Sequence, residues 1–263
     1  MTALRGVIGY ELRMQLRKRS LWLVLGALLA LEFGIQGPNF PTNLPADTPL
    51  RQTMGAWALT FNLIAPIGIG VLLADRLVRD RRLGVEDMLE GLPVRPGTRL
   101  WGKYLGVLAA GSLPILLCVA GAAGYEAIRN GDVTALGWGL LAFGGVNLPG
   151  LAFITAFALL VPAVLSAPLF RVLFVGYWFW GNLLNPDVLP TLTGSLLTPV
   201  GDYAAAGLFD ADPLWAGWPG FVSALRPHLS PGAGVASIAL LVGIAVVVLF
   251  LGQLLLTRSR ARA

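Results

Sequence analysis

The sequence is short of charge, cysteine and histidine, and each shortage excludes a class of protein. Only 13% of its 263 residues are charged, whereas 56% are hydrophobic. Ordinary soluble domains carry about 25% charged residues, so there is too little polar surface here to cover a water-soluble globule. The single cysteine, Cys118, cannot form a disulfide within the chain, and the single histidine, His228, has no second histidine for a metal site. These shortages predict an integral membrane protein without a metal centre.

The apolar residues form continuous blocks, each long enough to cross a bilayer as a helix of roughly 20 residues. Continuous blocks do not fit the alternating strands of a membrane β-barrel. We read the long tract 135–184 as two spans, with Pro149 and Pro162 kinking the first of them. The sequence thus predicts an all-α integral membrane protein with six transmembrane helices, at about residues 21–36, 54–74, 100–124, 136–165, 169–185 and 233–256.

Three further segments complete the predicted single transmembrane domain. In residues 3–19, apolar side chains recur at three- and four-residue steps among basic ones, which predicts an amphipathic helix in the headgroup layer. Residues 75–103 hold 12 charges in 29 residues, so the loop at 75–99 is expected to be solvated. Residues 186–232 form a long outer loop rich in proline and tryptophan, with a short helix predicted at 199–209.

The distribution of basic residues predicts the orientation. Cytoplasmic loops carry an excess of lysine and arginine. With six spans, 16 of the 19 basic residues fall on one side, together with both termini and the loop 75–99. We therefore expect both termini in the cytoplasm.

Residues 97–104, GTRLWGKY, differ from a nucleotide-binding P-loop at one position. Gly97, Gly102 and Lys103 fit the pattern G-x-x-x-x-G-K-[ST], but Tyr104 stands where Ser or Thr would hold Mg²⁺. The preceding LPVRP has two prolines, which disfavour the required strand, and an apolar block follows. We expect that this chain is not an enzyme and does not hydrolyse ATP.

Few polar residues lie inside the predicted spans. Glu32 either reaches headgroup water near the outer end of the first span or faces a pathway or another span. Asn62 and Asn147 either bond neighbouring helices or line a substrate path. Trp178–Trp180 are typical of an interfacial aromatic belt.

The charged segment after the second span has an ordered pattern. It carries an acidic residue, a glycine, a glutamate, an apolar run before a proline, a basic turn and then Gly-Lys. The matching residues are Asp80, Gly84, Glu86, Met88, Leu89, Pro93, Arg95, Gly102 and Lys103. With the basic helix before the first span, this order resembles the membrane subunit of bacterial ABC exporters of the type-2 permease family. Residues 197–210 resemble the short external helix of these permeases.

The resemblance implies specific partners. The loop 75–99 would form a coupling helix on a separate ATP-binding subunit, and the residues 3–19 would form an elbow helix that also touches this subunit. The elbow positions are Glu11, Leu12 and Leu16, and the implied docking residues are Asp80, Gly84, Glu86, Asp87, Leu89 and Glu90. The partner would hold ATP and Mg, with no cofactor in this chain. The resemblance also implies a second permease chain, identical or related, and a location in a bacterial cytoplasmic membrane. It implies no nucleic-acid partner.

Other interpretations of the sequence remain open. The loop 75–103 could be a solvated loop without a partner. An ion-coupled secondary transporter would need buried carboxylates or broken helices at the bilayer midplane. Glu32 is the one candidate carboxylate, and we expect it to lie too far from the midplane, near the outer end of the first span. A non-transporting membrane anchor or assembly factor is a third class, and the cargo is not predicted.

Overall fold

The computed structural model describes residues 2–36, 44–45, 47–74, 76, 96–220 and 222–260, and its regular structure in these ranges is helical throughout. Four short segments depart from α-helix: η1 (Phe143–Asn147) and η3 (Phe179–Leu183) are π-helical, and η2 (Val161–Ala163) and η4 (Ser223–Leu225) are 3₁₀-helical. The α-helices are α1 (Thr2–Leu16), α2 (Arg19–Gln36), α3 (Leu50–Phe61), α4 (Ala65–Leu73), α7 (Pro96–Asn130), α8 (Thr134–Ala142), α9 (Leu148–Leu160), α10 (Ala167–Trp178), α11 (Asp202–Phe209) and α12 (Pro231–Arg260).

Three helical stretches of the described residues are long and apolar enough to cross a membrane. They are Gly97–Asn130, Thr134–Ala163 and Pro231–Leu255, and the bent pair of α3 and α4 makes a fourth if it is counted as one span. An all-helical membrane protein is therefore supported. The count of six stays a prediction, because α2 and the stretch of α10 with η3 are not among these spans.

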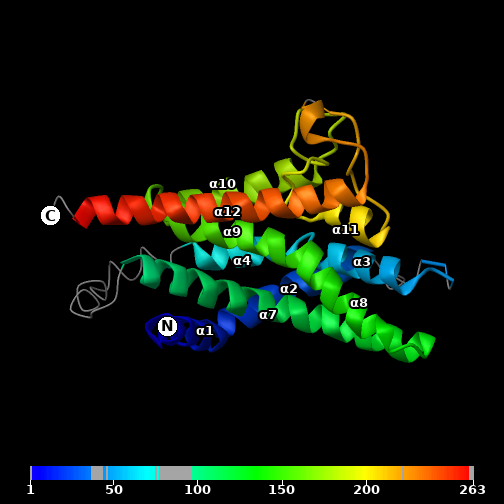
Figure 1. The fold of residues 1–263 in the computed structure, drawn as a ribbon, viewed down its shortest axis with the longest axis horizontal. Helices are drawn as coiled ribbons and strands as arrows, with labels where there is room; N and C mark the ends of the chain where they lie inside the picture. The colour runs from blue at the N-terminus through cyan, green and yellow to red at the C-terminus, as the bar shows by residue number, and fades with distance from the viewer. Residues whose placement is uncertain are drawn as a thin grey trace.

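The long helices run side by side along the molecule (Figure 1). α1 and the C-terminal end of α12 lie at one end of this bundle, and α11 lies at the opposite end with the segment before α12 (Figure 1). The first and the last helix thus meet at the same end of the bundle, as an even number of crossings between them would require. The core lies between α3, α4, α7, α9 and α10, where Trp178, Met54 and Ile154 are fully buried.

The second predicted span, 54–74, is a bent pair of helices. α3 ends at Phe61 and α4 begins at Ala65, and their axes differ by 42°. Pro66 lies in the first turn of α4 and has no N–H to continue the α-helical ladder across the break. Trp178 Nε1 donates at 2.6 Å to the Leu63 carbonyl, one of the backbone groups exposed by the break.

The fourth predicted span, 136–165, is one apolar stretch with irregular turns at both of its prolines. The π-helical segment η1 immediately precedes α9, which has Pro149 in its first turn. Pro162 lies in the 3₁₀ segment η2. Missing proline N–H groups account for a change of helical geometry at each place.

Candidate functional site

The residues that the family resemblance assigns to the coupling helix lie outside the described residues. The structure describes the two ends of this loop, Arg76 and the start of α7 at Pro96. The candidate site is therefore built from these ends and from α1. The residues outside the described ranges are Asp80, Gly84, Glu86, Asp87, Leu89 and Glu90.

A buried ion cluster joins α1 to both ends of the loop. Glu11 of α1 is only 3% exposed. Arg76 donates to it from Nε at 3.1 Å to Oε2 and from Nη2 at 3.0 and 2.8 Å to Oε1 and Oε2. Lys103 of α7 brings its Nζ within 3.7 Å of Glu11 Oε1. One carboxylate thus connects the residue just before the loop 77–95 with the first turns of the helix after it.

Two glycines of α7 allow α1 to approach this closely. A Cβ on Gly102 would lie 2.8 Å from Val7 Cβ, and one on Gly106 would lie 2.7 Å from Glu11 Cβ and 2.8 Å from the Ile8 carbonyl oxygen. The spacing G-x-x-x-G places both glycines on one face of α7. Substitution at either position would push α1 outward and lengthen the Glu11 contacts.

The other two predicted elbow residues are half-buried. Leu16 packs against the main hydrophobic core and accepts the Trp22 indole N–H on its carbonyl at 2.9 Å. Leu12 is half-buried. Of the three predicted elbow positions, Glu11 is the one in the ion cluster.

The segment that resembles a P-loop is helical. Gly97–Lys103 all lie within the first turns of α7, whereas a phosphate-binding loop precedes its helix. Tyr104 is buried and donates its hydroxyl to the Ala152 carbonyl at 3.1 Å. Gly102 and Lys103 are used in contacts with α1.

Asn62 and Asn147 bond to the backbone of neighbouring segments, as the helix-bonding alternative predicts. Asn62 Nδ2 donates to the carbonyls of Val200 at 2.9 Å and Pro199 at 3.1 Å, and also approaches the Val146 carbonyl at 3.4 Å. Asn147 Nδ2 donates to the Ala58 carbonyl at 2.8 Å. Both side chains are fully buried. These bonds hold the bent α3–α4 pair to η1 and to the segment before α11.

Glu32 is buried and has no hydrogen-bond partner for either carboxyl oxygen within the described part of the chain. Its side chain is 2% exposed, so the alternative in which it reaches water from the surface of the bundle is wrong. On the same face of α2, Leu25 and Leu28 contact Gly68 of α4. Glu32 lies one helical turn beyond Leu28, toward the end of α2, in the direction of the α3–α4 bend.

The sequence interpretation missed a third buried glutamate, Glu126, which lies toward the C-terminal end of α7. Glu126 is 1% exposed and accepts the Trp57 indole N–H at 3.2 Å and the Asn130 amide at 3.1 Å. Arg129 lies 3.9 Å from its Oε2. An isolated carboxylate at the end of an apolar block, three residues before an arginine, is the sequence signal that could have found it.

The aromatic-belt interpretation is wrong for Trp178 and fits Trp180. Trp178 is fully buried against the helix break, whereas Trp180 is 40% exposed and donates its indole N–H to the Pro190 carbonyl at 3.1 Å. Hydropathy alone does not distinguish the two, because they lie two residues apart and face different sides of the helix.

The short helix predicted at 199–209 is present as α11, and a buried carboxylate ties it to the following loop. Asp202 accepts the backbone N–H groups of Leu214 at 2.8 Å, Trp215 at 2.7 Å and Ala216 at 2.6 Å. Burial raises the pKa of the Asp202 carboxyl, and the three N–H donors lower it, burial being the larger influence. The helix starts after Gly201, whose φ of 86° favours glycine.

Comparisons of the chain with protein-family models, with curated proteins and with solved structures gave no match. Within the described ranges, no group of three or more His, Cys, Asp and Glu side chains is placed to hold a metal ion. The features that distinguish this molecule are thus the ion cluster at one end, the bent pair in the middle and the buried carboxylates Glu32 and Glu126.

Proposed function

We propose that this chain is the membrane-spanning permease subunit of an ATP-driven exporter. The observation that carries the proposal is the Glu11 ion cluster, because it connects α1 to both ends of the loop 77–95. A loop that receives force from a partner needs a rigid connection to the helices that it moves. A solvated loop without a partner has no such need.

The mechanism we propose begins in the cytoplasm. A separate subunit binds ATP and Mg and docks on the loop through Glu86, Asp87, Leu89 and Glu90. When two such subunits close on ATP, they displace the loop, and the cluster of Glu11, Arg76 and Lys103 passes this displacement to α4, α7 and α1 together. A second permease chain, identical or related, completes the translocation path. The chain then lies in a bacterial cytoplasmic membrane with both termini in the cytoplasm.

Carboxylates on the loop suit a basic surface on the ATP-binding subunit, since complementary charge favours encounter and fixes orientation. Charge reversal there is therefore expected to separate ATP hydrolysis from transport without unfolding the spans. The test is mild-detergent purification of the tagged chain from its host, with identification of what accompanies it and an ATPase assay. The variant is Glu86→Lys/Asp87→Lys.

The matched control is Asp47→Lys/Asp212→Lys, which reverses two exposed carboxylates outside the loop. Co-purification of a P-loop subunit whose ATPase activity is lost or uncoupled in the loop variant alone supports the proposal. A chain that emerges alone and inert, or a loop variant that behaves as its control does, rejects it.

A second candidate function is ion-coupled secondary transport, and two observations favour it. Glu32 is a buried carboxyl without a partner among the described residues, and α3 and α4 form a helix broken within the bundle. Buried ionisable residues and broken helices mark ion pathways in transporters. Transport by the purified chain in vesicles without ATP, driven by an ion gradient and lost in Glu32→Gln, would favour this function over the exporter.

A further inference from the structure

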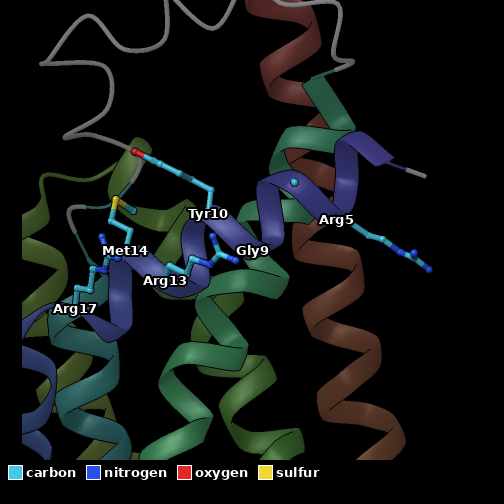
Figure 2. Close-up of a pocket in the computed structure, with 7 residues that line it drawn as sticks. Arg5, Gly9, Tyr10, Arg13, Met14 and Arg17 are labelled. Atoms are coloured by element: carbon cyan, nitrogen blue, oxygen red, sulfur yellow. The ribbon is translucent and has the colours of Figure 1, made fainter.

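The face of α1 opposite α7 carries a groove, which meets the ion cluster at one residue, Met14, whose Sδ accepts from Arg76 Nη2 at 3.3 Å. Its volume is about 610 Å³. Figure 2 shows the groove along α1, with Arg5 toward one end and Met14 and Arg17 toward the other. The groove is lined by Arg5, Gly6, Gly9, Tyr10, Arg13, Met14 and Arg17.

The groove has uncompensated positive charge. Arg5, Arg13 and Arg17 are separated by eight and four residues, so they lie in one row of the helix, and all three are exposed. None of their guanidinium groups has a hydrogen-bond or ion-pair partner in the part of the chain that the structure describes. The one acidic residue of α1, Glu11, is buried on the other side in its own ion cluster. A row of free guanidinium groups favours an anionic ligand.

Gly6 and Gly9 lie in the groove, and no contact with the described residues requires a glycine at either position. A Cβ added to Gly6 or Gly9 would meet nothing within 4 Å, in contrast to Gly102 and Gly106 of α7. Glycine inside a helix costs about 1 kcal/mol relative to alanine. Gly6, which is exposed, and Gly9, which is half-buried, leave a notch in which a group from outside can lie against the helix backbone.

The position of α1 indicates where that group comes from. Figure 1 shows α1 beside the first turns of α7 and not beyond the end of the bundle. Figure 2 shows it crossing the long helices, so its free face is directed sideways from the bundle. Tyr10 is 67% exposed on this face, and Trp22 of α2 is 41% exposed. Tyrosine and tryptophan are enriched at the headgroup level of membranes.

We propose that this groove binds the phosphate headgroup of an anionic phospholipid in the cytoplasmic leaflet. Arginine matches phosphate through charge-assisted, bidentate hydrogen bonds. The notch at Gly6 and Gly9 admits the headgroup beside the helix, between Arg5 and Arg13. The inference rests on the membrane orientation given under the proposed function, and it does not require the ATP-binding subunit.

The experiment measures lipid retention by native mass spectrometry on the purified full chain, with phosphatidylglycerol as the anionic probe and phosphatidylcholine as the neutral one. Each basic residue near an anionic surface contributes on the order of 1 kcal/mol. Arg13→Gln/Arg17→Gln is therefore expected to lower phosphatidylglycerol affinity roughly 30-fold and to leave phosphatidylcholine unchanged. Both side chains are exposed, so the variant is expected to fold.

Two further variants make the result specific. Arg258→Gln/Arg260→Gln removes the same charge from the end of α12, at the same end of the bundle, and is expected to retain the lipid. Gly6→Leu/Gly9→Leu fills the notch without changing the charge and is expected to weaken binding several-fold. The proposal would be overturned by an equal loss of phosphatidylglycerol in the Arg258→Gln/Arg260→Gln variant or by undiminished phosphatidylglycerol binding in the Gly6→Leu/Gly9→Leu variant. It would also be overturned if Arg13→Gln/Arg17→Gln released a bound protein subunit and retained the lipid.

Discussion

The strongest prediction concerns the ion pair between Glu11 and Arg76. Both side chains are almost fully buried, at 4% and 8% exposure, and their closest atoms are 2.8 Å apart. We expect that Glu11→Gln removes the buried carboxylate that both Arg76 and Lys103 approach. The spans would still form, but α1 would be held less firmly against α7.

The burial of both side chains determines the expected coupling energy between Glu11 and Arg76. At 2.8 Å, two unit charges attract with roughly 6 kcal/mol at an effective dielectric constant of about 20. Desolvation offsets most of this attraction, yet removing one partner of a buried pair typically costs about 3–5 kcal/mol. For a double-mutant cycle of Glu11→Gln and Arg76→Gln, we therefore expect a coupling energy of about 2 kcal/mol or more.

The molecule supplies a control pair with similar geometry and different burial. Arg51 and Asp210 are 3.1 Å apart, but their side chains are 38% and 68% exposed. A surface pair of this kind contributes less than about 1 kcal/mol. Both cycles can be measured as free energies of unfolding in mixed micelles titrated with dodecyl sulfate. Equal coupling energies for the buried and the exposed pair would refute the assignment of Glu11 as the group that fixes α1 to Arg76, the residue just before the segment 77–95.

Three other predictions concern the bend, the outer loop and the buried carboxyl. Gly150→Ala should destabilise the protein by several kcal/mol, since its Cβ would overlap the Pro199 carbonyl oxygen, whereas a Cβ at Gly144 would meet no described atom and Gly144→Ala should be nearly neutral. Asp202→Ala should remove the acceptor of three backbone N–H groups, that of Ala216 being buried, and should speed proteolysis of the segment after α11. Unchanged proteolysis of this segment would contradict the prediction. Glu32→Gln should not lower thermal stability, because its carboxyl oxygens have no partner among the described residues. A marked loss of thermal stability in Glu32→Gln would contradict this prediction and show that the Glu32 carboxyl group makes a stabilising contact.

Much of the helical pattern could be predicted from hydropathy, because an apolar block of bilayer length has few other stable conformations. The blocks predicted at 100–124 and 233–256 correspond to α7 and α12, and each helix extends beyond its block at both ends. Hydropathy did not predict the 42° bend between α3 and α4. Its cause is one missing N–H at Pro66, which does not alter the apolar character of the block.

The candidate site was less predictable, because its contacts join residues far apart in the sequence. Glu11 was assigned to the elbow helix from its position, but its pairing with Arg76 depends on how α1 packs on α7. Glu126 was missed because it follows an apolar block, where a solvated end is the usual interpretation. The sequence could not decide whether Glu32 reaches headgroup water or is covered by other helices. The position of a residue along a helix does not show which neighbouring segments bury its side chain, and Glu32 is 2% exposed.

The close fit of α1 on Gly102 and Gly106 also sets an order of events during synthesis. α1 precedes α7 in the sequence, and two predicted spans and the loop 77–95 separate them. At a synthesis rate of about 5–20 residues per second, several seconds pass between the synthesis of α1 and that of the α7 surface on which it packs. During that interval the Glu11 carboxylate has neither Arg76 nor Lys103 beside it, so water or headgroups must solvate it. The docking of α1 therefore marks the moment when α7 has been made, and a nascent chain that stops earlier keeps its first helix exposed at the membrane surface.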